Sequence, residues 1–345
     1  MRKRLHFIVL FLIAVLIIWW FGRGLNWAEV KQTVWQSDWR LLTAAIGVSC
    51  LVYALSASRC RALLEPFASA RWLDVFIATI IGIVAMFIAG RAGDGVRALM
   101  ITSRDRRVPP SASLVTVVLE RLCDIGIVIT LFGLNLLWLS PPAGREDTFA
   151  HLRVVGAVLL LGILSGVACL WLFQRKADAI LPWLGRRGKY WTGPVVYARR
   201  LIIRVFEQLA KSLRVFVDLR ELAIVVGWTV LLWCVNAVTI WLVLKAFGLT
   251  FGFSHSVFVM GWTLVGSLLP TPGGAAGAYH AATAAALVVL GADRDQAAAV
   301  AIVLHLVGYT PALLFAFYFI MKGDVSLGRL QHLRGVRPVG GMSLE

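Results

Sequence analysis

Long apolar stretches, separated by short polar segments, run along most of the chain. About twenty apolar residues are needed to cross the hydrocarbon core of a bilayer. Six stretches are near that length, and we predict them as full spans: 5–22, 41–64, 112–139, 152–173, 222–247 and 296–321. Hydrophobic residues make up 59% of the 345 positions, against roughly 45–50% in a soluble domain. The pattern predicts one integral membrane domain over residues 1–345.

Two further apolar segments, 73–89 and 255–290, are interrupted by polar and helix-breaking residues. The run Gly90–Arg97 follows the first, and the run Pro270–Gly274 lies inside the second. Unpaired backbone amides in hydrocarbon cost several kcal/mol each, so a broken helix persists only where it lines a cavity or is buried in protein. The two breaks therefore indicate a site.

The basic clusters indicate the membrane topology of the two interrupted segments. The net charge is +16, and eleven Lys and Arg residues lie between Arg175 and Arg220. Cytoplasmic loops carry such excesses. If 73–89 crossed fully, the basic loops 91–111 and 174–221 would face outside. We therefore predict two re-entrant hairpins entering from opposite faces, with both termini in the cytoplasm.

The positions of the basic clusters also indicate which class of partner the chain binds. Basic clusters beside spans favour attraction to anionic membrane lipids, and they argue against nucleic acid as a partner. The first span, 5–22, has no small-residue cleavage motif after it, so we predict a retained anchor rather than a signal peptide. The basic loop 175–220 contains an amphipathic stretch over 198–216 that predicts an interfacial helix. That helix would lie on lipid or pack on the spans, and the sequence leaves both open.

The two breaks are followed by similar patterns, which suggests an internal repeat. Each is followed by a helical stretch, a polar turn and a span, over residues 73–139 and 255–321. The spans 112–139 and 296–321 are predicted to run in opposite directions. The fold class is therefore an all-α polytopic membrane protein with an inverted repeat, a plan that many transporters share.

Three ionisable residues, Glu120, Arg121 and Asp124, lie within an otherwise apolar span. Each costs about 2.5–3.5 kcal/mol on insertion scales, so function is the default reading of such a residue. Arg121 can reach Asp124 at spacing i,i+3, which leaves one acid without a partner on this helix. A polar cavity is favoured over an internal ion pair that only fixes helix packing.

The breaks supply further candidates. Arg91, Asp94 and Arg97 lie in the first break, where guanidinium groups and free amides would suit a phosphate; the alternative is an ordinary basic loop. His280 and His305, with Tyr309 one turn on, follow the second break. They are either neutral packing residues or groups for proton relay and headgroup contact.

Enzymatic chemistry is not indicated. The sequence has no nucleophile elbow, metal-ligand spacing or phosphate-binding loop. Its five cysteines form no CxxC pair, which argues against a disulfide framework or a zinc site. We expect no catalytic residues, no metal and no cofactor.

Three motifs in order resemble one family: Arg91-Ala-Gly-Asp-Gly-Val-Arg97, then Glu120-Arg121 with Asp124, then Pro270-Thr-Pro-Gly-Gly-Ala-Ala-Gly277. The chain is similar to the lysylphosphatidylglycerol synthase transmembrane-region family, also called flippase-like domain proteins, over about residues 5–321. Two positions depart from the family pattern. Asp94 stands where members usually have Glu, and His280 stands where many have Glu.

The resemblance implies lipid translocation at the bacterial inner membrane. Little chain follows residue 321, so we expect no soluble aminoacyl-transfer domain and no lipid aminoacylation. Arg91, Arg97 and Arg121 would engage the phosphate of an anionic or other phosphate-bearing headgroup. The alternatives are a membrane transferase acting on lipid-linked sugars or amino acids, and a non-transporting partner of a lipid-biosynthesis enzyme. The expected substrate-binding residues are Arg91, Asp94, Arg97, Glu120, Arg121, Asp124, Pro272, Gly273, Gly274, His280, His305 and Tyr309.

Overall fold

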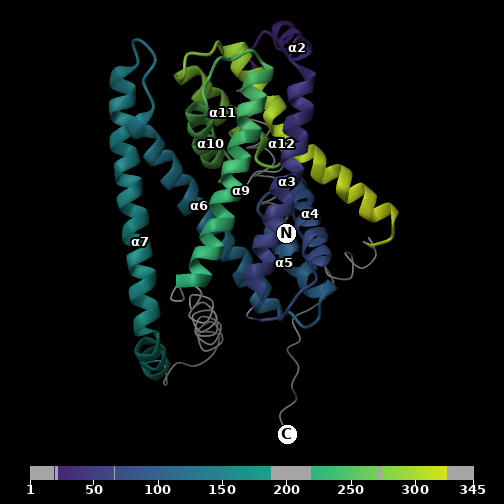
Figure 1. Ribbon diagram of the computed structural model, residues 1–345, viewed down its shortest axis with the longest axis vertical. Helices are drawn as coiled ribbons and strands as arrows, with labels where there is room; N and C mark the ends of the chain where they lie inside the picture. Colours follow the sequence, from purple (N-terminus) through teal and green to yellow (C-terminus); the bar gives the residue numbers. More distant parts are fainter. Residues whose placement is uncertain (1–18, 20–21, 66, 188–218, 270–272, 325–345) are drawn as a thin grey trace.

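The computed structural model describes residue 19 and residues 22–65, 67–187, 219–269 and 273–324. Within these ranges every regular element is a helix (Figure 1). The helices are α2 (Trp27–Trp35), α3 (Trp39–Leu64), α4 (Trp72–Ala89), α5 (Ala92–Arg104), α6 (Pro110–Trp138), α7 (Glu146–Arg187), α9 (Leu219–Ala246), α10 (Phe253–Ser267), α11 (Ala276–Val289) and α12 (Arg294–Met321).

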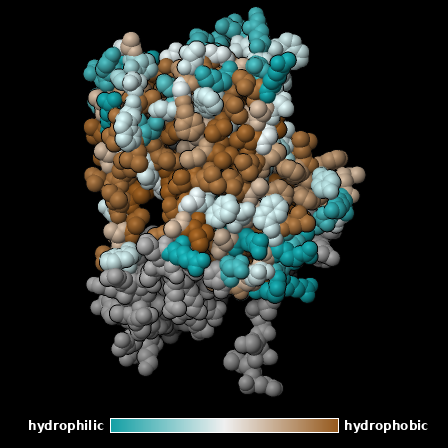
Figure 2. All heavy atoms as spheres, in the orientation of Figure 1, coloured by the Kyte–Doolittle hydropathy of each residue, from teal (hydrophilic) through white to brown (hydrophobic). Residues whose placement is uncertain are grey.

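The chain is a multi-pass membrane protein. Five described helices are long and apolar enough to cross a bilayer, namely α3, α4, α9, α12 and the Glu146–Cys169 part of α7. Figure 2 shows the corresponding band of apolar side chains, with hydrophilic residues above it and at its lower right. Helix α7 stands at the edge of the molecule in Figure 1, and only 6% of its most apolar window is buried inside the protein. Its apolar side chains therefore suit contact with lipid.

The first interrupted segment folds as a helical hairpin. Helix α4 ends at Ala89, α5 begins at Ala92, and the two helices pack side by side. Gly93 makes their close approach possible, because a Cβ atom there would lie 2.3 Å from the backbone nitrogen of Met86. By length and composition α4 also qualifies as a crossing helix. The count of six full spans therefore stays a prediction.

The second interrupted segment folds in the same way. Helix α10 ends at Ser267, α11 begins at Ala276, and the two helices pack together. The end of the break has an unusual backbone, with positive φ angles at Gly273, Gly274 and Ala275. Pro272 and the rest of 270–272 lie outside the described residues.

The described helices form two groups in the same order, a long helix, a two-helix hairpin and a second long helix, over α3–α6 and α9–α12; we call these groups the two repeats. Helices α3 and α9 pack in opposite directions, as the hydrogen bond from the Asp38 backbone N–H to the Ala246 carbonyl (2.8 Å) shows for the end they share. Helix α6 packs on α10 of the other half, and α12 packs on α4. In Figure 1 the α4–α5 hairpin lies in the lower half of the molecule and the α10–α11 hairpin in the upper half.

Some predicted elements are longer in the structure, and others lie outside the described residues. Each repeat begins one helix earlier than the ranges 73–139 and 255–321, because α3 and α9 belong to it. Helix α7 continues to Arg187, so the predicted loop from 174 starts as helix. Most of the anchor 5–22 and the amphipathic stretch 198–216 lie outside the described residues.

Candidate functional site

The two breaks meet. The Nη2 atom of Arg91, in the first break, donates a hydrogen bond to the carbonyl of Ser267 at the end of α10 (3.1 Å). A cavity of about 180 Å³, which we call the charged cavity, lies at this junction. Its lining residues are Met86, Gly90, Arg91, Arg121, Asp124, Ile125, Trp233, Leu264, Ser267, Leu269, Gly274, Ala275 and Tyr309.

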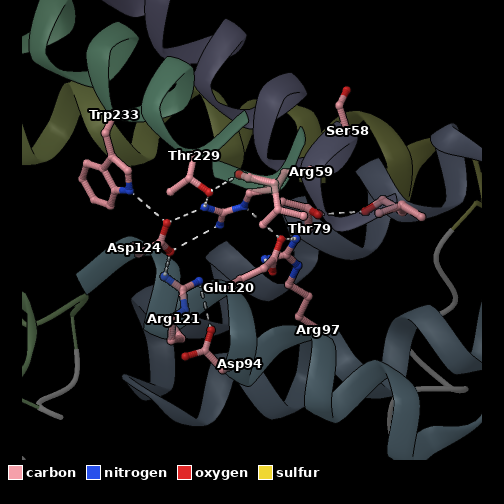
Figure 3. A network of polar contacts seen from close by, with 12 residues as sticks. Ser58, Arg59, Thr79, Asp94, Arg97, Glu120, Arg121, Asp124, Thr229 and Trp233 are labelled. Carbon is pink, nitrogen blue, oxygen red and sulfur yellow. Dashed lines mark hydrogen bonds and ion pairs between the residues drawn. The ribbon is translucent and has the colours of Figure 1, made fainter. Parts of the chain in front are cut away.

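A buried group of two cations and two anions lies beside this cavity (Figure 3). Arg59 of α3 pairs with Asp124 through two contacts, Nη1 to Oδ1 at 2.6 Å and Nη2 to Oδ2 at 3.3 Å. Arg97 of α5 pairs with Glu120, with Nη1 to Oε2 at 2.8 Å, and Arg59 Nε lies 3.5 Å from the same carboxylate. All four side chains are at most 6% exposed. We call these four residues the inner group; their charges balance.

The helical spacing of α6 places both acids of the inner group correctly. Glu120 and Asp124 are four residues apart and therefore share one face of the helix. That face meets α3 and α5, which deliver Arg59 and Arg97. Burying an ion costs several kcal/mol, and close pairing offsets that cost only when the geometry is good. The two-point contact between Arg59 and Asp124 meets this condition.

An outer group of charges includes two cations that line the cavity, Arg91 and Arg121. Arg121 Nη2 lies 3.2 Å from Asp94 Oδ1, and Arg121 Nη1 lies 3.2 Å from Asp124 Oδ2. Arg91 Nη1 lies 3.9 Å from Asp94 Oδ2. The side chains of Arg91 and Arg121 are 31% and 32% exposed. The outer group, Arg91, Asp94 and Arg121, thus holds two cations and one anion, so the site carries a net charge of +1.

Two expectations from the sequence need correction. Glu120 was expected to lack a partner, but Arg97 and Arg59 both contact its carboxylate. Arg97 was expected to engage phosphate, but it is 3% exposed and turned toward Glu120, and it does not line the charged cavity. The sequence argument counted charges along α6 alone and could not include cations from neighbouring helices.

Sequence reasoning missed Arg59, Thr229 and Trp233. Arg59 Nη1 lies 3.3 Å from the hydroxyl of Thr229, and Trp233 Nε1 donates to Asp124 Oδ1 at 2.9 Å. Arg59 lies inside the predicted span 41–64 but was not singled out as a candidate. A cation inside a span is itself a signal. Trp233 offered no signal among 14 tryptophans.

An aromatic cluster lies on the other side of the second break. The ring of His305 is 4.9 Å from the rings of Tyr279, His280 and Tyr309, measured between centroids. Gly274 lies against Tyr309, since a Cβ atom there would lie 2.6 Å from the phenol oxygen. Of the predicted residues in this region, Gly274 and Tyr309 line the charged cavity, whereas His280 does not.

One group of acids among the described residues has spacing that suits a cation. Carboxylate oxygens of Glu29, Asp293 and Asp295 lie within 4.8 Å of one another. None of them lines the charged cavity, and acids grouped at a surface are common without an ion. We assign no function to them.

Comparison with protein families decides the relationship that the motifs suggest. The family model described as the lysylphosphatidylglycerol synthase TM region matches residues 7–316. The chain belongs to this family. The match covers the first repeat and the second up to residue 316 in α12, so the hairpins, the charged cavity and the inner group all lie within the family domain. A comparison with curated proteins gives no match.

Proposed function

We propose that the chain binds the phosphate-bearing headgroup of a membrane lipid in the charged cavity and moves the lipid between leaflets. The observation that carries the proposal is the excess cation of the outer group. Arg91 and Arg121 share the carboxylate of Asp94, line the cavity and remain about a third exposed. Guanidinium groups bind phosphate through two parallel hydrogen bonds, so this arrangement suits a phosphate better than an amine.

The link between the two hairpins gives binding a way to drive movement. Arg91 donates to the Ser267 carbonyl across the junction. A phosphate is a stronger acceptor than a neutral carbonyl, and it would compete for the same guanidinium. Loss of this link would let one hairpin move relative to the other. In inverted-repeat transporters such relative movement of the two repeats exposes a central site to each side in turn.

Family membership supports a lipid as the cargo. The matched region is named for the membrane part of an enzyme that makes a phosphatidylglycerol derivative. The proposal places the protein in the bacterial inner membrane with both termini in the cytoplasm, since that orientation leaves the basic segments on the cytoplasmic side. The lipid would leave the site chemically unchanged.

The test reconstitutes the full-length protein in vesicles with phospholipids that carry a fluorescent acyl chain. External dithionite bleaches only the outer leaflet, so lipid movement appears as loss of the protected signal. We expect Arg121→Gln to slow movement at least tenfold. The matched control, Arg106→Gln, removes an exposed cation with no ion-pair partner among the described residues and should stay within twofold of wild type.

Two results would contradict the proposal. The first is equal rates for wild type, Arg121→Gln and vesicles without protein, with every lipid tested. The second is a change in lipid mass during incubation with candidate donors, which would support a membrane transferase. A non-transporting partner would give the first result but would co-purify with a lipid-biosynthesis enzyme.

A further inference from the structure

A second cavity, which we call the neutral cavity, adjoins the charged one. Its volume is about 210 Å³, and it shares Trp233, Leu264, Ser267 and Tyr309 with the charged cavity. Its other lining residues are Ser49, Val52, Tyr53, Asn236, Thr239, Ile240, Thr263, Tyr279, Leu304, His305 and Gly308. They come from α3 and from all four helices of the second repeat. A headgroup held at Arg121 therefore has a polar compartment beside it.

The neutral cavity differs from the charged one in chemistry. None of its described lining residues is Asp, Glu, Lys or Arg. Its polar groups are mainly hydroxyls, and several already donate to carbonyls of their own helix: Thr239 to Val235 at 3.3 Å and Thr263 to Met260 at 2.8 Å. Because a hydroxyl oxygen also has two lone pairs, these groups can still accept hydrogen bonds from a ligand.

Asn236 adds hydrogen-bond donors to the lining of the neutral cavity. Its side chain is half-buried, lines the cavity and has no hydrogen-bond partner among the described residues. An amide offers two N–H donors and one acceptor oxygen. Because these groups are not engaged by the protein, they are available to a ligand in the cavity. The neutral cavity therefore suits a ligand that both donates and accepts, as an alcohol does.

Charged groups fit this compartment poorly. An ammonium group would find no carboxylate among the described lining residues, and it would lie near a site of net charge +1, where repulsion is strong in a low dielectric. A second anion would find no guanidinium on these walls. Burying an unpaired charge costs far more than burying a hydroxyl that is hydrogen-bonded.

Trp233 lies between the two cavities and connects them to the inner group. Its Nε1 donates to Asp124 of the inner group, and Trp233 is a lining residue of both cavities. The charged cavity takes its guanidinium groups from the first repeat, whereas the neutral cavity is built mainly from the second. The two repeats thus supply complementary parts of one binding region.

We infer that the cargo is a lipid whose phosphate carries a neutral, hydroxyl-bearing group such as glycerol or a sugar, with that group in the neutral cavity. The inference rests on the proposed function, since the phosphate is placed by Arg91 and Arg121. It goes further in naming the substrate class. Headgroups that end in an amine, and phosphatidate, which has no group beyond the phosphate, should bind less tightly.

Binding to the purified full-length protein in detergent tests this, with dioctanoyl lipids that differ only in headgroup. We expect phosphatidylglycerol and phosphatidylinositol to bind at least tenfold tighter than phosphatidylethanolamine, phosphatidylcholine or phosphatidylserine. Asn236→Leu and Thr239→Val should each weaken phosphatidylglycerol binding about fivefold and leave phosphatidate within twofold. Cys234→Ala, on the same helix but outside both cavities, should change neither.

The possible failures are distinguishable. Equal binding of phosphatidylglycerol and phosphatidylethanolamine, or an unchanged preference in both Asn236→Leu and Thr239→Val, would overturn the inference while Arg121-dependent binding still stands. Tightest binding of phosphatidylcholine would overturn it in favour of a cation held by the aromatic rings. Lipid binding that is unaffected by Arg121→Gln would remove the proposed function, and this inference with it.

Discussion

Glu120 offers the sharpest test of the inner group. Its side chain is fully enclosed, and it pairs with Arg97 at 2.8 Å and with Arg59 at 3.5 Å. Glu120→Gln keeps the shape but removes the charge. Arg97 cannot release its proton to compensate, and its side chain is 4% exposed. Removing one partner of a buried ion pair costs about 3–5 kcal/mol, so we expect a loss of stability of that size.

Two further variants separate electrostatics from packing. Arg97→Gln combined with Glu120→Gln replaces the pair by two neutral amides, and we expect the double variant to recover at least about 1.5 kcal/mol relative to the sum of the single losses. Asp94→Asn is the matched control in the outer group. Its carboxylate is 19% exposed and contacts Arg121 at 3.2 Å; solvent screening limits the loss there to about 1 kcal/mol.

Reversible unfolding in mixed detergent micelles, followed by tryptophan fluorescence, measures these differences. The 14 tryptophans of the chain give a strong signal. The reasoning fails if Glu120→Gln costs no more than Asp94→Asn. It also fails if the two inner substitutions add without any coupling, because then Glu120 does not balance the charge of Arg97.

Two other predictions concern the hairpin and the outer group. Gly93→Ala places a Cβ atom 2.3 Å from the Met86 backbone and should lower the unfolding free energy by at least about 2 kcal/mol. The control, Gly95→Ala, has no atom within 4 Å of the new Cβ and should be neutral or stabilise the protein by up to about 1 kcal/mol. Equal effects of the two substitutions would contradict the close packing of α4 on α5. Asp94→Asn frees Arg91 and Arg121 from their shared carboxylate and should tighten phosphatidate binding about threefold to tenfold in a titration, opposite in sign to Arg121→Gln. Weaker binding would show that Asp94 helps to hold the ligand.

The sequence predicted the two breaks well, because each follows from a local constraint. A glycine-rich or proline-rich interruption in an apolar run has few physical solutions, and the structure forms a hairpin at each. The i,i+3 contact of Arg121 with Asp124 was also predictable, since it depends on helical geometry alone.

The pairing of the inner group was not predictable from one helix. Glu120 finds its cations on α3 and α5, so its environment depends on how three helices cross. Asn236 and Thr239 were overlooked for a related reason. Single polar residues in apolar spans are common, and only the packing of α9 against α3 and α10 shows that these two line a cavity.

The charged residues of the site are all synthesised before the second repeat, and this order affects how they enter the membrane. All seven charged residues of the inner and outer groups, Arg59, Arg91, Asp94, Arg97, Glu120, Arg121 and Asp124, belong to α3, the first hairpin or α6. They emerge from the ribosome before any residue of the second repeat. Singly, each would oppose entry into hydrocarbon. Together their charges nearly cancel, so they can leave water as a set. The second repeat then assembles around a polar centre whose net charge is only +1.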